Sequence, residues 1–314
     1  MRLRDFGNTS LQVSELGLGC ARIGGVFQSN ARGFLDLLSF AFDSGVNFFD
    51  TADMYSQGES ESLIGKALRG KRDRVVIASK AGYSLPSRRR WAGRIKPLLR
   101  PLVQLLKIRR DQLPSGSRGA LSQDFSPTYL QAAVEGSLRR LRTDYLDILQ
   151  LHSPPLDVVE RGEWLPALEE LKRNGKIRYY GVAVDSIDAG LAALRYPGVS
   201  SVQFTLNLLE RGGADALFPT AERQGVGGIA RECLANGLLV KRPDEIDLKG
   251  YCSSPAQELQ RTEQLAALRR EAADTGRSVL RSAIAYPGSV PGVSVTLLGA
   301  RSIEQLASLL EAAR

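Results

Sequence analysis

Short apolar runs alternate with amphipathic helical stretches over most of this chain of 314 residues. The runs are continuously apolar, which is typical of strands buried on both faces of a parallel sheet. The candidate strands are Glu15–Leu18, Val46–Asp50, Val75–Ser79, Tyr145–Leu151, Ile177–Ala183, Val202–Thr205, Gly227–Ala230 and Val293–Leu298. The candidate helices are Ala31–Ser44, Glu59–Arg69, Pro127–Leu141, Trp164–Asn174, Ala214–Gln224, Pro255–Thr275 and Ile303–Ala313. This pattern predicts an α/β fold of the (β/α)8 TIM-barrel type.

The competing architecture is an open doubly wound sheet, but no G-x-G-x-x-G motif follows an early strand. Helix boundaries support the assigned stretches: Ser126-Pro127 and Ser302 are plausible starts, and Gly45, Gly70 and Gly175 are plausible stops. The opening segment, Leu3–Ser14, predicts a β-hairpin around Gly7-Asn8 that covers the barrel floor. We expect residues 1–314 to form one domain.

The positive charge of the chain is concentrated in one segment. The net charge is +8, yet residues 85–120 hold ten Arg or Lys and one acid, Asp111. The remainder is therefore close to neutral, and we interpret residues 84–126 as a basic loop inserted after the third strand, at the rim of the barrel. Nucleic-acid binding is not expected, because the only nearby aromatic residues are Tyr83, Trp91 and Phe125 and no recognition motif accompanies them.

Three interpretations of this insertion remain open. It can be a lid that shapes a substrate pocket, since loops on this rim set specificity. It can be a partly disordered, solvated loop. It can also bind an anionic membrane surface or an acidic partner through residues 88–110, as basic amphipathic segments do.

Other features indicate an ordinary globular protein of the cytoplasm. The N-terminus lacks an apolar signal core, and no run approaches 18 apolar residues. Cys20, Cys233 and Cys252 lack metal-ligand spacing and cannot all pair, so we expect a reducing compartment. Oligomeric state is left open.

Polar side chains stand where three of the predicted strands end. Asp50, Lys80 and His152 lie at or just after strand ends, and Tyr55 follows Asp50 by five residues. His152 is the single histidine of the chain. Because functional groups of such barrels gather at the carboxyl ends of the strands, these four side chains are expected to meet at one mouth.

Their chemistry is coherent. A lysine beside an aspartate stays charged, and its charge lowers the pKa of a neighbouring phenol. Tyr55 could then give a proton to a carbonyl oxygen while His152 orients the substrate. No nucleophile is evident and a single histidine cannot build a multi-histidine metal site, so no metal is expected. Hydride transfer from a bound nicotinamide fits these constraints.

Each residue also has an ordinary structural interpretation. Asp50 could cap a helix, Lys80 could be a surface charge, Tyr55 could pack in a loop, and His152 could be a core histidine with satisfied hydrogen bonds. Four such coincidences at corresponding strand ends are harder to accept than one shared site.

At these residues the sequence resembles the aldo-keto reductase family. The motifs, in family order, are Gly45-Val-Asn-Phe-Phe-Asp-Thr-Ala-Asp-Met-Tyr55, Ala78-Ser-Lys80, Asp144-Tyr-Leu-Asp-Ile-Leu-Gln-Leu-His152, Gly175-Lys-Ile-Arg-Tyr-Tyr-Gly-Val182 and Gly299-Ala-Arg-Ser302. The resemblance covers nearly everything outside residues 85–125. It implies a (β/α)8 barrel, reduction of a small-molecule carbonyl substrate by NADPH, and a catalytic tetrad of Asp50, Tyr55, Lys80 and His152 with Tyr55 as proton donor.

The resemblance also implies a set of cofactor-binding residues: Gln203, Arg231, Leu234, Gly237, Gly299, Arg301, Ser302 and Gln305. The segment from Gly299 to Ser302 precedes a helix, whose N–H groups and dipole favour an anion. Arg301 adds a planar cationic fork suited to a 2′-phosphate, which favours NADPH over NADH. Leu309 stands where the family often has an asparagine, and it can pack against adenine without hydrogen bonding to it.

Departures from the family cluster around the nicotinamide. Ala183-Val184 stand where the family commonly has Ser-Asn to hold the carboxamide, and Gln203 still matches the usual third partner. Arg231 replaces the aromatic residue that stacks on the nicotinamide, as in an arginine-bearing variant, and a guanidinium can stack flat. Its charge would oppose the oxidised cofactor and bias the reaction toward reduction. Alternatively, Arg231 or Glu232 contacts a polar substrate.

The sequence thus predicts an NADPH-dependent reductase of an aldehyde or ketone. A nicotinamide-binding regulatory subunit with little turnover is the alternative from another functional class. An enzyme that oxidises alcohols is a third possibility, made less attractive by the charge of Arg231.

Overall fold

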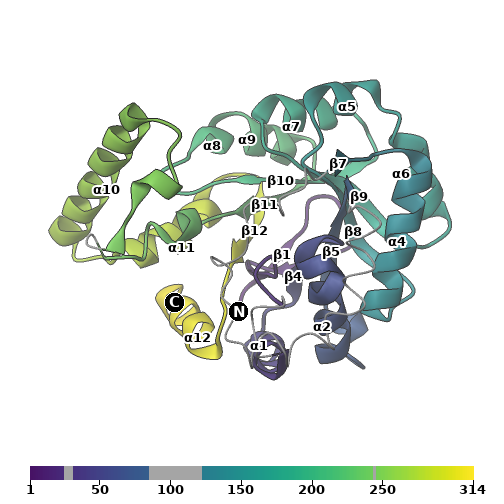
Figure 1. Cartoon of the computed structure of the whole chain (residues 1–314), viewed down its shortest axis with the longest axis horizontal. Helices are drawn as coiled ribbons and strands as arrows, with labels where there is room; N and C mark the ends of the chain where they lie inside the picture. The colour runs from purple at the N-terminus through teal and green to yellow at the C-terminus, as the bar shows by residue number, and fades with distance from the viewer. Residues whose placement is uncertain (25–30, 85–121, 243–244) are drawn as a thin grey trace, which may run out of the picture.

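A computed structural model describes residues 1–24, 31–84, 122–242 and 245–314. Its centre is a closed barrel of parallel strands, in the order β10-β11-β12-β3-β4-β5-β8-β9 (Figure 1). The strands are β3 (Leu16–Gly19), β4 (Phe48–Asp50), β5 (Val76–Ala81), β8 (Leu146–His152), β9 (Ile177–Ala183), β10 (Val199–Thr205), β11 (Gly227–Arg231) and β12 (Val293–Leu298). The predicted (β/α)8 barrel is confirmed, and each of its eight strands overlaps a predicted one.

The interior of the barrel is apolar near its floor and polar near its mouth, where the strands end. Phe48, Val76, Ile148 and Val295 pack together inside it, all of them buried. Side chains alternate along a strand, so residues two positions further along point into the same interior nearer the mouth. Asp50 lies two residues after Phe48 in this way. Polar side chains at these positions therefore face the barrel interior at the carboxyl ends of the strands.

The N-terminal hairpin is present as predicted. It pairs β1 (Leu3–Asp5) antiparallel with β2 (Gln12–Ser14). Phe6 of the connecting turn is fully buried, and its ring stacks on Phe48 with centroids 6.0 Å apart. Gly7 adopts φ +54°, and a Cβ there would lie 2.3 Å from the carbonyl oxygen of Gly225. The hairpin thus closes the barrel floor.

Helices surround the strands (Figure 1). They are α1 (Ala31–Asp43), α2 (Glu59–Ala67), α4 (Pro127–Leu141), α5 (Leu156–Arg161), α6 (Leu165–Arg173), α7 (Ile187–Ala193), α8 (Gly212–Asp215), α9 (Leu217–Arg223), α10 (Pro255–Thr275), α11 (Val279–Ser289) and α12 (Ile303–Ala312). The side chains of Ser126 and Ser302 cap α4 and α12 as expected. In the part of the chain that the structure describes, no helix is both long and apolar enough to cross a bilayer.

The helix predictions were wrong in two respects. The expected helix Ala214–Gln224 is two short helices, α8 and α9, separated by Ala216 with φ −131°. Three further helices were not predicted: α5, α7 and α11. With six or seven residues, α5 and α7 are too short to show a clear helical period, and α11 contains Pro287.

The basic insertion is anchored at both ends. β6 (Tyr83–Ser84) pairs antiparallel with β7 (Ser122–Gln123), which brings the two ends together. The Gln123 side-chain amide donates to the carbonyl oxygen of Ser153, 2.8 Å away, just beyond the end of β8. Residues 85–121 lie outside the described residues, so the lid, solvated-loop and membrane or acidic-partner interpretations of 84–126 stay predictions.

Candidate active site

Asp50 and Lys80 form a buried ion pair at the mouth of the barrel. Asp50 is the last residue of β4, and Lys80 lies near the end of the neighbouring strand β5. The Lys80 Nζ donates to Asp50 Oδ2 at 2.6 Å and to the carbonyl oxygen of Thr51 at 3.1 Å. Both side chains are at most 5% exposed. A charged pair at this depth needs extra hydrogen bonds, and Gln203 supplies one from its Nε2 to Asp50 Oδ1 at 2.8 Å.

Tyr55 and His152 complete the cluster. Lys80 Nζ donates to the Tyr55 hydroxyl at 3.4 Å. The rings of Tyr55 and His152 meet edge to face, with centroids 5.7 Å apart. Tyr55 begins a tight turn, Tyr55–Gly58, in which Ser56 and Gln57 have φ values of 50° and 61°. The four residues singled out from the sequence therefore lie together, and their catalytic roles stay predictions.

The acidity of Tyr55 differs from the sequence-based expectation. Burial raises the pKa of Tyr55 above its ordinary value, and the nearby charge of Asp50 acts in the same direction. Lys80 lowers this pKa, as predicted, but does not outweigh burial. The phenol is consequently protonated throughout the physiological pH range, which suits a group that must hold a proton until it is needed.

His152 is held as a neutral imidazole. Burial, followed by the charges of Lys80 and Arg231, lowers the pKa of His152 from 6.5 to about 3. Its Nδ1 is buried and has no hydrogen-bond partner among the described residues. Tyr83 packs on the ring edge to face, with centroids 4.9 Å apart, and the Tyr83 carbonyl accepts from the Tyr129 hydroxyl at 2.8 Å. Tyr83, which sequence reasoning did not select, thus fixes one side of the imidazole.

We expect the single histidine to titrate near pH 3. The pKa of His152 is lower in the folded protein than in the unfolded one. Its contribution to the free energy of unfolding is therefore fully present above pH 6.5 and is lost as the pH falls toward 3. The unfolding free energy of the wild type relative to His152→Gln should drop by at most about 1.4 kcal/mol per pH unit in that window. NMR of the imidazole Cε1 proton, with denaturation at pH 6 and pH 5, measures both. A pKa near 6.5 in the folded protein would contradict this environment.

Arg231 reaches over the end of β10 to an acid that the sequence did not indicate. From the end of β11 its guanidinium donates to Asp185 Oδ1 at 2.5 Å, to the Val184 carbonyl at 3.0 Å and to Thr205 Oγ1 at 3.2 Å. Burial raises the pKa of Asp185, but hydrogen bonds from Arg231 and Ser153 outweigh it and hold that pKa below its ordinary value. Arg231 is therefore no isolated cation, and the reductive bias expected from its charge alone does not follow.

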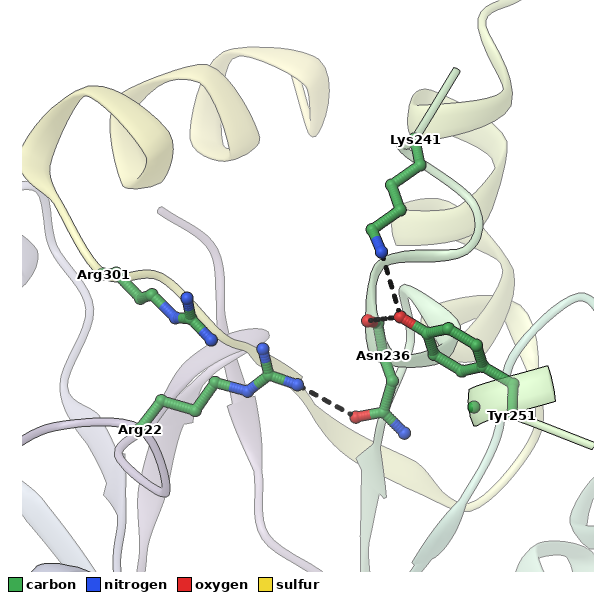
Figure 2. Close-up of a pocket in the computed structure, with 6 residues that line it drawn as sticks. Arg22, Asn236, Lys241, Tyr251 and Arg301 are labelled. Atoms are coloured by element: carbon green, nitrogen blue, oxygen red, sulfur yellow. Dashed lines mark hydrogen bonds between the residues drawn. The ribbon is translucent and has the colours of Figure 1, made fainter. Parts of the chain in front are cut away.

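A cationic pocket of about 530 Å³ opens beside this cluster. Figure 2 shows Arg22 and Arg301 facing Asn236, Lys241 and Tyr251 across it. Arg22 follows β3, Arg301 follows β12, and the other three follow β11, so consecutive strands of the barrel contribute. Arg22 donates to Asn236 Oδ1 at 3.4 Å, and Lys241 donates to the Tyr251 hydroxyl at 3.2 Å. Of these residues, sequence reasoning selected Arg301 alone.

The loop after β11 has an unusual backbone. Glu232, Ala235 and Asn236 have φ values of 57°, 47° and 54°, which lie in a backbone region that residues other than glycine rarely adopt. The buried Asn207 steadies this loop by donating to the Glu232 carbonyl at 3.1 Å. Strain of this kind persists where a backbone is shaped for a function. Gly237, with φ +99°, has open space beside it, and Leu234 is half-buried in the same loop.

The segment before α12 is arranged partly as expected. Gly299 is exposed, with nothing within 4 Å of an added Cβ, so a ligand can approach its backbone. However, Gln305 accepts a hydrogen bond from the Arg301 backbone N–H at 2.9 Å, and Ser302 accepts one from the Gln305 N–H at 3.3 Å. The Gln305 side chain is therefore occupied by the backbone just before the helix cap, and the Arg301 side chain is the group directed at the pocket (Figure 2).

Comparison with known proteins gives a consistent result. The model of the Aldo/keto reductase family matches residues 15–314. The oxidoreductase YqkF of Bacillus subtilis is 31% identical over 319 residues, which cover 100% of this chain and 91% of that protein. Pyridoxal 4-dehydrogenase of Microbacterium luteolum is 28% identical, with 96% and 90% covered.

Solved structures agree. The holo form of aldo-keto reductase AKR11C1 from Bacillus halodurans superposes with a TM-score of 0.80 at 30% identity, over 100% of this chain and 91% of that one. The glycerol dehydrogenase AKR11B4 from Gluconobacter oxydans gives a TM-score of 0.77 at 25% identity, over 99% and 90%. The family motifs found in the sequence, the closed barrel and the clustered strand-end residues all point the same way: this chain is an oxidoreductase that belongs to the aldo/keto reductase family.

Proposed function

We propose that the protein is an NADPH-dependent reductase of aldehydes or ketones, with Tyr55 as the proton donor. The observation that carries this proposal is the contact of the Tyr55 hydroxyl with the buried Lys80–Asp50 pair, beside the neutral imidazole of His152. A protonated phenol whose oxygen already accepts from an ammonium group can release its proton to a developing alkoxide.

Each residue of the cluster has its own role in the proposed reaction. When bound, NADPH supplies the hydride. Lys80, kept charged by Asp50, stabilises the negative charge that Tyr55 acquires as its proton leaves. His152, being neutral, donates one N–H hydrogen bond that orients the carbonyl oxygen without competing as an acid. The site needs no nucleophile for this reaction.

The described residues fit a phosphorylated dinucleotide. Arg22, Lys241 and Arg301 converge on one pocket, and their charge suits phosphate groups. The open backbone at Gly299 and Gly237 allows close approach from two sides. Arg301 is the residue we assign to the 2′-phosphate, and Arg22 and Lys241, facing each other over the pocket, to the diphosphate.

The test is NADPH oxidation with a panel of carbonyl compounds. The panel should include aliphatic and aromatic aldehydes and ketones. Glycerol and other alcohols with NADP+ belong in it as well, because several relatives are named as dehydrogenases. Turnover of any carbonyl supports the proposal. Tight NADPH binding without turnover of any compound would overturn it and favour a regulatory subunit.

We expect Arg301→Ala to remove the preference for NADPH. Loss of a charge-assisted contact to the 2′-phosphate should raise the Kd for NADPH about tenfold to a hundredfold, while the Kd for NADH changes less than twofold. Fluorescence titration with both cofactors measures this. Arg195→Ala is the matched control, since Arg195 follows α7 at the opposite end of the barrel and is 71% exposed. Equal weakening of both cofactors would exclude the assignment.

A further inference from the structure

The end of β9 lacks hydrogen-bonding side chains where the nicotinamide is expected to bind. Val184 and Ala183 are fully buried and apolar, so neither can hydrogen bond to a ligand through its side chain. Gln203 commits one of its two amide N–H groups to Asp50, at 2.8 Å, and so keeps one N–H and its oxygen for any other group. Among these three side chains a carboxamide would therefore find one polar partner, Gln203, which is already held by Asp50.

We propose that the Asp185–Arg231 pair binds the carboxamide of the nicotinamide. This inference rests on the proposed function, because it concerns the same cofactor. A primary carboxamide presents one acceptor oxygen and two donor N–H groups. Arg231 supplies donors and Asp185 supplies an ionised acceptor, so the ion pair offers both kinds of partner side by side.

The position of the pair supports this role. Arg231 comes from β11 and Asp185 from just beyond β9, and Arg231 crosses the end of β10 to reach it, bonding to Thr205 at 3.2 Å on the way. The pair therefore bridges the end of β10 at the rim of the barrel, and Gln203 lies two residues before Thr205 on the same strand. Both charges act on His152, Arg231 lowering its pKa and Asp185 raising it, so the pair lies close to the catalytic cluster.

The fixed geometry also supports a binding role. Besides Asp185, Arg231 donates to the Val184 carbonyl at 3.0 Å, which holds the guanidinium in place. Its side chain is 19% exposed, whereas that of Asp185 is 64% exposed. Asp185 thus keeps surface for a ligand after pairing with Arg231. A surface ion pair with no further role would gain little from three anchors on one arginine.

The experiment compares two cofactors on four proteins, the wild type and three variants. NADP+ and its 3-acetylpyridine analogue both carry the carbonyl oxygen, but the analogue has a methyl group in place of the NH2 group. Kd values come from calorimetry or quenching of intrinsic fluorescence, with no turnover required. We expect the wild type to bind NADP+ about tenfold more tightly than the analogue, the value of one hydrogen bond to a charged group.

The variants separate the two halves of the pair. Asp185→Ala should weaken NADP+ about tenfold and leave the analogue nearly unchanged, which abolishes the discrimination. Arg231→Met should weaken both compounds to a similar degree, because both retain the oxygen that Arg231 binds. Asp188→Ala, an exposed acid at the start of α7, is the control and should discriminate like the wild type.

The outcomes are distinct. If Asp185→Ala keeps the full discrimination, or weakens both compounds equally, Asp185 only positions Arg231 and the inference is wrong. Failure of the wild type to bind either NADP+ or NADPH would overturn the proposed function itself. Circular dichroism of Asp185→Ala excludes misfolding as a cause, and the exposed position of Asp185 makes a folded variant the expected result.

Discussion

Tyr55→Phe is expected to lower kcat for carbonyl reduction by about a hundredfold to ten-thousandfold, the usual contribution of a positioned general acid. The substitution removes one oxygen atom and keeps the ring that packs against His152. The Kd for NADPH should therefore change less than twofold. Steady-state kinetics at saturating NADPH, together with a binding titration, provide both numbers.

The matched control is Tyr145→Phe. Tyr145 lies just before β8, at the floor end of the barrel, where its ring packs under the Arg72 guanidinium at 3.9 Å. Removing that hydroxyl should leave kcat at the wild-type level. If Tyr55→Phe retains more than about a tenth of wild-type kcat, the acid is another group and the proposed role of Tyr55 is wrong. An effect on KM alone would likewise assign Tyr55 to binding.

The strand-end residues were predictable because regular structure positions them. Once parallel strands are recognised, their carboxyl ends must share one face, so Asp50, Lys80 and His152 come together without knowledge of any loop. The side-chain period of two then turns each of them inward. The barrel and its floor hairpin were predicted from the same kind of local pattern. Short helices such as α7 were not predicted, because they hold too few residues to show a period.

The residues that sequence reasoning missed lie in loops. Asp185, Arg22 and Lys241 have no periodic context, and their neighbours depend on loop conformations that no local pattern encodes. Asn207 and the strained backbone at Ala235 are consequences of tertiary structure in the same sense. The acidity of Tyr55 was misjudged for a related reason. The sequence indicates that Lys80 is near but says nothing about how deeply the phenol is buried.

Lys80→Met is expected to have the second large effect, on stability as well as on activity. Although burial lowers the pKa of Lys80, Asp50 and Tyr55 raise it above its ordinary value, so the wild-type ammonium stays charged. Removing it leaves the Asp50 carboxylate buried without its counter-charge, which should cost about 3–5 kcal/mol of unfolding free energy. Activity should fall as well, because the charge that stabilises ionised Tyr55 is lost.

The double variant Asp50→Asn/Lys80→Met distinguishes the loss of a charge from the loss of packing. The introduced asparagine carries no charge, and it keeps an oxygen that can accept from Gln203 Nε2, which lies 2.8 Å from Asp50 Oδ1 in the wild type. The double variant should therefore recover at least about 2 kcal/mol relative to Lys80→Met, since neutral buried groups need no counter-ion. Urea denaturation of all four proteins in the cycle measures the coupling. Activity should remain low in the double variant, because stability returns without the ammonium that Tyr55 requires. A double variant no more stable than Lys80→Met would show that the lysine stabilises the barrel mouth through packing, and not by neutralising Asp50.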